Sequence, residues 1–350
     1  MENFDYFNKN QANEILSIRA GERKLGEKLQ YINSKETNLS LSELFKALKE
    51  IPAKYIIFGV NEFIGVQANL GTSGEKHTWQ LFLKNFLNIQ HNKFLKGSNM
   101  TVLGSFNYQK YEAEALLLNP SNKSDLQRLR EIVNEIDKDI VYLNTLIYQA
   151  GKKAIIIGGG HNNAYGNIKG LALAMGKNVN VVNFDAHTDF RSMEGRHSGN
   201  GFSYAFQEGF VDNYYIFGAH ENYLSKYMLK QFKEHRQKIH LNTFEELKVR
   251  FEKDFISTVN AISKCIKAKP YGVEIDVDAI ENIGSSAMSP SGFSVTEARQ
   301  FVNLISASSN ASYIHVCEGA ASRSPLPENM IGKLVTYLVT DFIKAQQFVK

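Results

Sequence analysis

The chain has 350 residues, of which 43% are hydrophobic and 22% are charged, and its formal net charge is +4. These values are ordinary for a globular protein with a substantial core, and a small charge without a basic block gives no indication of a nucleic-acid partner. The amino terminus lacks the basic and apolar regions of a signal peptide, no run is long enough to span a bilayer, and Cys265 and Cys317 lie far apart. We therefore expect a cytoplasmic protein without membrane association or a disulfide scaffold.

Apolar runs rich in β-branched and aromatic residues recur along the chain and predict strands that are covered on both faces. They lie at residues 55–60, 101–104, 153–158, 179–184, 214–218, 238–241, 271–276 and 313–318. Between them, apolar residues spaced three and four apart predict a helix over residues 126–147, with a capping box of Ser124 and Gln127 at its start and Gly151 at its end. Residues 294–306 and 327–348 are also predicted to be helical.

The alternation of strands and helices is typical of an α/β fold with a mainly parallel sheet. Six prolines and the lack of a linker leave few places for a domain boundary. We expect one catalytic domain over residues 51–350, preceded by a helical extension over residues 1–50.

Three segments at the ends of predicted strands carry side chains that bind metals well. The six residues are His161, which directly follows three glycines, Asp185, His187 and Asp189 after the run 179–184, and Asp276 and Asp278 at the end of the run 271–276. Alternate residues of a strand point to the same side, and ligands of such sheets bind beyond the carboxyl ends of the strands. We therefore expect the six side chains to meet at one point.

Each segment also has a simpler explanation. Asp and Thr at a strand end often cap the next helix, alternating acids suit a solvated edge strand, and a glycine run can cradle a phosphate. The glycine run here lacks both a Gly-Lys-Ser/Thr ending and the GxGxxG spacing. The combination favours metal, because acids and imidazoles crowded at the edge of an apolar core destabilise one another without a cation. Glu274 lies deeper in its strand, and we predict a structural or supporting role for it.

The predicted ligands are four carboxylates and two imidazoles, without a thiolate. This hard set suits manganese better than structural zinc or copper. Two divalent ions that share carboxylates can lower the pKa of a bridging water, so the chemistry indicated is hydrolysis.

The same motifs resemble the signatures of the ureohydrolase family, which includes arginase, agmatinase and formimidoylglutamase. The matching segments are Gly158-Gly159-Gly160-His161, Asn183-Phe184-Asp185-Ala186-His187-Thr188-Asp189 and Glu274-Ile275-Asp276-Val277-Asp278. Upstream, Ile64-Gly65-Val66, Asn69 and Gly71 resemble the amino-terminal glycine/asparagine loop of that family. The resemblance covers roughly residues 50 to 345.

The resemblance implies a three-layer α/β/α sandwich around a mainly parallel sheet of about eight strands, with two Mn2+ ions per chain. It implies that His161, Asp185, Asp189 and Asp276 hold one ion, and that His187, Asp185, Asp276 and Asp278 hold the other. Asp185 and Asp276 would bridge the ions, and Asp189 would also orient a hydroxide that attacks the amidine carbon.

Residues that contact the substrate are predicted from the same resemblance. Glu318 matches a late glutamate that pairs with the cationic end of the substrate, or else it supports the site from behind. His197 is predicted to transfer protons, or else to lie on a mobile loop. Arg191 and Asn200 are predicted to bind a substrate carboxylate, with a surface ion pair as the alternative for Arg191, and Glu221 to line the mouth of the site.

The loop around Ser198-Gly199 resembles that of formimidoylglutamases, whereas arginases and agmatinases carry a His-Gly pair there. We therefore predict a homo-oligomeric enzyme that hydrolyses a small amidine or guanidino substrate, N-formimidoyl-L-glutamate, to L-glutamate and formamide, as in histidine catabolism. Arginase activity is the first alternative. A non-catalytic relative and a deacetylase-like enzyme with one zinc ion are the others.

Overall fold

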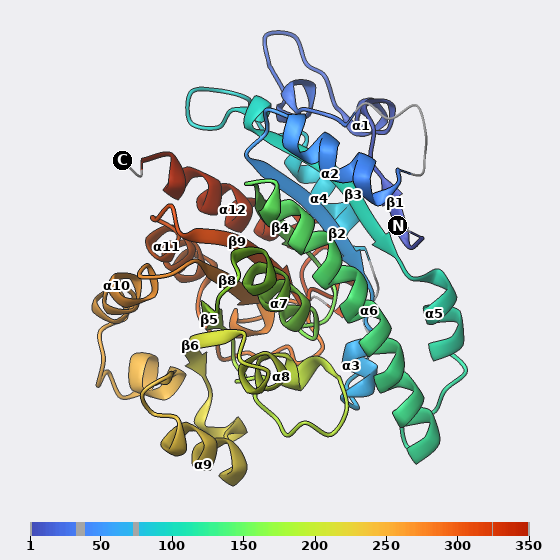
Figure 1. The fold of residues 1–350 in the computed structure, drawn as a ribbon. Coiled ribbons are helices and arrows are strands. Elements are labelled where there is room, and N and C mark those ends of the chain that lie inside the picture. The colour runs from blue at the N-terminus through green and yellow to red at the C-terminus, as the bar shows by residue number, and fades with distance from the viewer. Residues whose placement is uncertain (1, 33–38, 73–76, 324, 349–350) are drawn as a thin grey trace.

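A mainly parallel sheet forms the centre of the structure, a computed structural model that describes residues 2–32, 39–72, 77–323 and 325–348 (Figure 1). Within those residues the sheet has nine strands in the order β1-β3-β2-β4-β9-β8-β5-β6-β7. The strands are β1 (Phe4–Tyr6), β2 (Tyr55–Asn61), β3 (Met100–Asn107), β4 (Lys153–Ile157), β5 (Val179–Phe184), β6 (Val211–Ala219), β7 (Ile239–Thr243), β8 (Tyr271–Asp276) and β9 (Ala311–Cys317). All pairs are parallel except the edge pair β1–β3.

Helices cover both faces of this sheet. They are α1 (Lys9–Ile15), α2 (Leu41–Glu50), α3 (Ile64–Ala68), α4 (Thr78–Phe86), α5 (Gln109–Ala115), α6 (Lys123–Gln149), α7 (Asn163–Met175), α8 (Gly201–Gln207), α9 (Lys226–Glu234), α10 (Phe255–Ile266), α11 (Val295–Ile305) and α12 (Asn329–Ala345). One core contains side chains of α4, α10, α11 and α12, and the other contains side chains of α2, α6, α7, α8 and α9. The predicted three-layer α/β/α sandwich is therefore confirmed.

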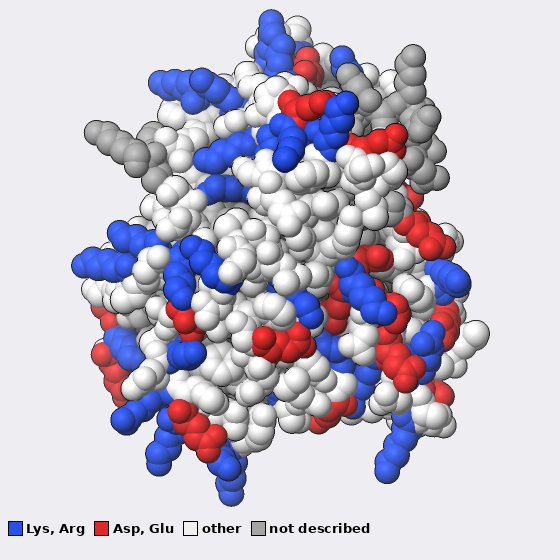
Figure 2. Space-filling view, viewed as in Figure 1, with Lys and Arg blue, Asp and Glu red and all other residues white. Residues whose placement is uncertain are grey.

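Strand β4 shows why both faces are covered. Ile155 and Ile157 belong to the first core, whereas Ala154 and Ile156 belong to the second. Because successive strand residues point to opposite faces, a continuous apolar run places one apolar set in each layer. Among the described residues, no helix is both long and apolar enough to cross a membrane. On the face seen in Figure 2, basic and acidic side chains are interspersed.

Two local features differ from the sequence predictions. The cap of α6 is Asn122, whose Oδ1 accepts from the backbone N–H of Ser124 at 2.9 Å, so the helix begins one residue before the predicted capping box. The segment predicted to be a helical extension contains α1 and α2 but also supplies β1, which pairs with β3. This short antiparallel strand has too few residues to show a periodic pattern.

The strand order decides where the site forms. Strands β4, β9, β8 and β5 are consecutive neighbours in the middle of the sheet. Their carboxyl ends lie at one edge because the strands are parallel, so the segments that follow them meet there.

A buried arginine fixes the long connection between β5 and α8 over this edge. Arg196 Nε donates to Asp137 Oδ2 on α6 at 2.8 Å, and Nη2 donates to the carbonyl of Asn162 at 2.9 Å. Its guanidinium lies 4.8 and 4.9 Å from the ring centres of Tyr165 and Tyr204. Arg196 is 1% exposed, so its charge depends on these contacts for compensation.

Replacing Asp137 with asparagine is expected to lower the free energy of unfolding by about 3–5 kcal/mol, because Arg196 would keep a buried charge without its counterion. Chemical denaturation followed by circular dichroism measures this loss. Glu131→Gln on the same helix is the control, since its pair with Arg128 is exposed and should change stability by less than about 1 kcal/mol. Equal effects of the two substitutions would contradict the role given to Arg196.

Candidate metal centre

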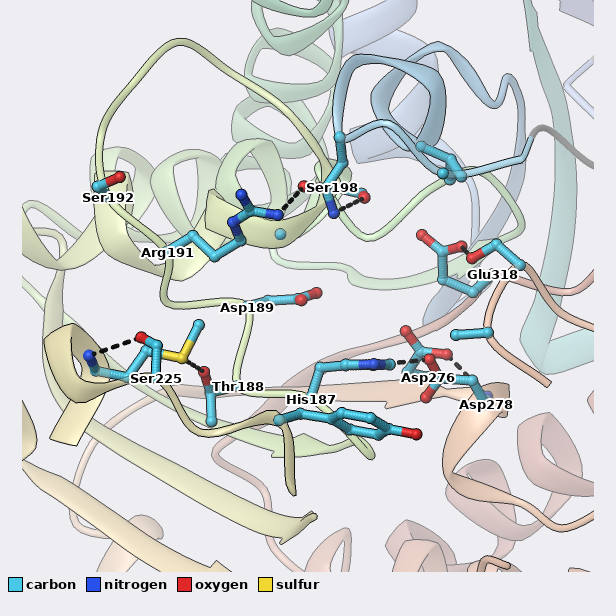
Figure 3. Close-up of a pocket in the computed structure, with 18 of the residues that line it drawn as sticks. His187, Thr188, Asp189, Arg191, Ser192, Ser198, Ser225, Asp276, Asp278 and Glu318 are labelled. Atoms are coloured by element: carbon cyan, nitrogen blue, oxygen red, sulfur yellow. Dashed lines mark hydrogen bonds and ion pairs between the residues drawn. The ribbon is translucent and has the colours of Figure 1, made fainter. Parts of the chain in front are cut away.

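A cavity of about 720 Å³ opens at the carboxyl edge of the sheet. Its lining includes the predicted ligands His187, Asp189, Asp276 and Asp278, together with Glu318. Figure 3 shows these side chains around one space, although they come from the end of β8 and from the segments that follow β5, β8 and β9. The structure therefore brings distant parts of the sequence together as predicted from the strand ends.

The glycine run turns the chain so that the ring of His161 lies against Asp185, Asp189 and Asp276. Gly158 and Gly159 have φ angles of +85° and +75°, in the left-handed region that favours glycine. The turn leaves His161 1% exposed, and its backbone N–H donates to Glu318 Oε1 at 2.8 Å. The glycines thus serve to aim a histidine.

The first group of donors surrounds His161 Nδ1. This atom lies 2.8 Å from Asp189 Oδ2, 3.2 Å from Asp185 Oδ2 and 3.4 Å from Asp276 Oδ2. One ligand atom from each of the four residues lies within 4.8 Å of the others. The four predicted members of one ligand set are therefore close enough together to hold one ion.

The second group lies beside the first. His187 Nδ1 is 2.9 Å from Asp278 Oδ2 and 3.5 Å from Asp185 Oδ1. Asp185 belongs to both groups and turns one oxygen towards each, whereas Asp276 belongs to the first group alone. Of the two predicted bridging ligands, Asp185 has this shared position in the structure.

Burial and mutual repulsion perturb the acids strongly. Burial, and next the charge of Asp185, raises the pKa of Asp189 to about 6. Burial, followed by the charges of Asp278 and Asp185, also raises the pKa of Asp276. Burial opposes ionisation of Asp185 too, but the neighbouring imidazoles of His161 and His187 lower the pKa of its carboxyl below the usual value. Divalent cations would compensate this concentration of negative charge.

The donor chemistry also fits metal. Among the described residues, His161 Nδ1 and Asp278 Oδ1 are buried side-chain atoms without a hydrogen-bond partner. Buried polar atoms are normally paired, so two such atoms facing clustered carboxylates are suited to coordination. Carboxylate oxygens with two imidazoles form a hard donor set that suits Mn2+.

Two of the acids have strained backbones. Asp189 has a φ of +43° and Glu318 a φ of +61°, a region that residues other than glycine rarely adopt. Glu318 follows β9, and its Oε2 accepts from Ser286 Oγ at 3.0 Å. Burial raises the pKa of Glu318 to about 8. The predicted late glutamate therefore lies in the cavity. One of its carboxylate oxygens accepts from the backbone N–H of His161 and the other from Ser286 Oγ.

Arg191 is predicted either to bind a substrate carboxylate or to form a surface ion pair. It lines the cavity, and its Nη1 donates to Asn69 Oδ1 at 2.8 Å. Its Nη2 is 3.4 Å from Glu194 Oε1, but the side chain remains 45% exposed. Its guanidinium is therefore accessible to an anionic group in the cavity.

The structure corrects the prediction for His197. This side chain is fully buried and is absent from the described lining of the cavity. Its Nδ1 accepts from the backbone N–H of Gly199 at 3.1 Å. Burial, and then the charges of Arg191 and Arg130, lowers the pKa of His197 to about 3. A neutral histidine that cannot reach the cavity holds its own loop in shape and cannot transfer protons to a substrate there.

Asn200 and Glu221 are corrected in the same way. Asn200 is buried, where its Oδ1 accepts from Arg196 Nη1 at 2.6 Å and its Nδ2 donates to the carbonyl of Gly195 at 2.8 Å. Glu221 accepts from both terminal nitrogens of Arg250, at 2.7 and 3.0 Å. Neither residue is in the described lining of the cavity. The amide of Asn200 and the carboxylate of Glu221 therefore bind other residues of the protein and not a substrate.

Several lining residues were not predicted. Tyr223 stacks on His187 with ring centres 4.9 Å apart, and Ser225, Met228 and Ser286 complete parts of the wall. Tyr223, Ser225 and Ser286 lie in turns or loops, where no period or motif distinguishes a lining residue, and Met228 lies in α9, where its spacing indicates only an apolar helix face.

Comparison with known proteins gives a family match. A model described as "Arginase family" matches residues 84–325. A formimidoylglutamase of Streptococcus pyogenes serotype M3 is 33% identical over 102 residues, which cover 27% of this chain and 30% of that protein. The alignment to this relative thus spans less than a third of its length.

Solved structures share the fold. The formimidoylglutamase of Bacillus subtilis has a TM-score of 0.70 at 15% identity, with 95% of this chain and 94% of that chain covered. The formiminoglutamase of Trypanosoma cruzi with Mn2+ has a TM-score of 0.67 at 19% identity, covering 89% of this chain and 100% of that chain. A hypothetical agmatinase from Burkholderia thailandensis has a TM-score of 0.65 at 16% identity, covering 84% and 86%.

The shared position of Asp185 predicts different metal losses for two substitutions. Asp185→Asn is expected to leave well below about one Mn2+ per chain after dialysis, because both groups lose a ligand, whereas Asp278→Asn should retain about one. Elemental analysis counts the metal, and the Mn2+-dependent rise in melting temperature provides a second measurement. Asp212→Asn, whose partner Lys269 lies elsewhere, is the control. The same metal content in the Asp185 and Asp278 variants would refute the shared position.

Proposed function

The chain belongs to the arginase family, and from that premise we propose that it is a hydrolase that holds two Mn2+ ions and cleaves a C–N bond of a linear amidine. The observation that supports this most strongly is the pair of donor groups joined by Asp185 at the floor of a cavity. A carboxylate shared by two donor groups suits two neighbouring cations, and Asp185 turns one oxygen towards each group.

The proposed roles of the ligands follow from these positions. His161, Asp185, Asp189 and Asp276 would hold one ion, and His187, Asp185 and Asp278 the other, with Asp276 as the further predicted bridge. When bound, the ions supply activation of a water molecule as the nucleophile. Asp189 has one carboxylate oxygen at His161, and we propose that its carboxylate orients this water towards the substrate.

Two further residues would orient the substrate. Figure 3 shows Arg191 and Glu318 on different sides of the cavity, with Asp189 between them. Arg191 would bind a carboxylate through its guanidinium fork, and the cationic amidine end, placed at Glu318, would favour ionisation of that carboxyl and pair with it. A substrate with an amidine at one end and a carboxylate at the other fits this arrangement.

We propose N-formimidoyl-L-glutamate as the substrate, hydrolysed with one water to L-glutamate and formamide. Among the described lining residues, Arg191 is the side chain with a permanent positive charge, which suits a carboxylate-rich substrate. The name of the partly aligned streptococcal relative and the Ser198-Gly199 loop support the same substrate.

Product identification tests the proposal directly. Protein stripped with a chelator and reloaded with Mn2+ is incubated separately with N-formimidoyl-L-glutamate, L-arginine and agmatine, and the products are identified by mass spectrometry. We expect formamide and glutamate from the first substrate, and no turnover by Asp189→Asn. Formation of urea from arginine would show that arginine is the substrate in place of N-formimidoyl-L-glutamate. If the protein retains both ions but forms no product, the result would support the non-catalytic alternative.

Arg191→Met is expected to raise KM for N-formimidoyl-L-glutamate by roughly 10- to 100-fold, because a charged hydrogen bond contributes about 1.5–3 kcal/mol. Steady-state kinetics should show little change in KM for an N-alkylformamidine, which has no carboxylate. Arg128→Met is the matched control, since Arg128 pairs with Glu114 away from the cavity. A similar rise for both substrates would mean that Arg191 shapes the cavity without recognising a carboxylate.

A further inference from the structure

A row of polar side chains crosses the centre of the sheet, deeper than the candidate ligands. In the strand register, Asn183 of β5 lies opposite Glu274 of β8, and Glu274 lies opposite His315 of β9. All three side chains are fully buried. A charged group in the interior of a sheet is costly without partners, so the contacts of Glu274 decide how it is tolerated.

Three side chains hold Glu274 in one orientation. Its Oε2 lies 2.6 Å from His315 Nδ1, and its Oε1 accepts from the hydroxyl of Tyr313 at 2.8 Å. Asn167 Nδ2 on α7 also donates to Oε1, at 3.3 Å. Both oxygens are thus engaged by partners from β9 and α7, so the carboxylate has little freedom to turn.

His315 links this carboxylate to the glycine turn. Its Nε2 lies 3.1 Å from the carbonyl oxygen of Gly158. A carbonyl only accepts, so Nε2 must carry a hydrogen, and Nδ1 shares the other hydrogen with Glu274. Because both nitrogens of His315 are engaged, the nearby thiol of Cys317 and His161 do not form a separate metal site with it.

Glu274 lies next to the candidate ligand His161, on the side of the ring that faces away from the aspartates. His161 Nε2 lies 3.6 Å from Glu274 Oε2, on the other side of the ring from Nδ1 and its three aspartates. Within the described chain, His161 Nε2 is a buried atom without a hydrogen-bond partner. If Nδ1 binds a cation, the hydrogen of the neutral ring must be on Nε2, where it faces this carboxylate.

We propose that Glu274 is the positioning residue of His161, and that the pair it forms with His315 fixes the ring so that Nδ1 faces the metal. Metal-bound histidines commonly donate their second N–H to a carboxylate, which orients the ring and strengthens the ligand. The inference rests on the proposed metal centre but concerns only one of its two groups. His187 has a different support, the ring of Tyr223, so the two groups can be separated by experiment.

Glu274→Gln tests the role, because it keeps the shape of the side chain and an acceptor for Tyr313 while it removes the charge. The substitution is made in two backgrounds: Asp278→Asn, which isolates the group around His161, and His161→Ala, which isolates the group around His187. Mn2+ affinity is measured by calorimetric titration and by the electron paramagnetic resonance signal of free Mn2+. We expect a loss of about 10- to 100-fold in the first background and no loss in the second.

Two controls separate positioning from general damage. Asp341→Asn removes a buried carboxylate that Arg299 binds at 2.6 Å between α11 and α12, and it should lower the melting temperature without changing Mn2+ affinity. Tyr313→Phe removes one hydrogen bond from Glu274 and keeps the ring. It should weaken the His161 group less than Glu274→Gln does, and it remains informative where Glu274→Gln does not fold.

The outcomes distinguish the inference from the proposed function. Wild-type protein that takes up no Mn2+ would overturn the metal centre and the inference with it. Wild-type protein that binds two ions, with unchanged affinity in both Glu274→Gln backgrounds or an equal loss in both, would overturn the inference alone. A loss caused by Cys317→Ala, with none caused by Glu274→Gln, would assign the role to the thiol.

Discussion

The repulsion among four buried aspartates that meet in one site is the constraint on which this structure depends. Asp185 and Asp189 follow β5, Asp276 ends the neighbouring β8 and Asp278 lies in the turn after it, so the strand order brings the charges together. Backbone N–H groups compensate part of the charge: that of residue 187 donates to Asp185 Oδ1 at 2.6 Å, and that of Asp278 to Asp276 Oδ1 at 2.8 Å. The raised pKa values of Asp189 and Asp276 indicate that this is insufficient without cations.

The surrounding segments hold the acids in place against that repulsion. Arg196 ties the connection after β5 to α6 and to the start of α7, and the strained backbones of Asp189 and Glu318 persist because their neighbours determine them. The buried, neutral His197 belongs to this framework. The loop that bears Arg191 is therefore built on interior contacts, while Arg191 itself remains exposed to the cavity.

The strands and the convergence of the candidate ligands could be predicted from the sequence, because both follow from short apolar runs and the residues at their ends. Asp185, His187 and Asp189 directly follow the end of β5, and a parallel sheet gathers such strand ends at one edge. The roles of His197 and Asn200 could not be predicted, because they depend on Arg196 and on Asp137, which lies 59 residues from Arg196 in the chain. No local pattern records such a contact, and a histidine next to a site looks the same in sequence whether it faces the cavity or the core.

The motif around β8 shows that acidic residues with the same spacing meet different surroundings, depending on how far each lies from the end of the strand. Glu274, Asp276 and Asp278 alternate in sequence, but β8 ends at Asp276 and a 3-10 turn carries Asp278 to the second group. Glu274 lies about 7 Å further into the sheet than Asp276, at two strand residues' rise, and there it meets His315 and Tyr313 in place of a cavity. Three acids with one spacing thus acquire three environments, and the deepest can act on a cation only through the imidazole that lies between them.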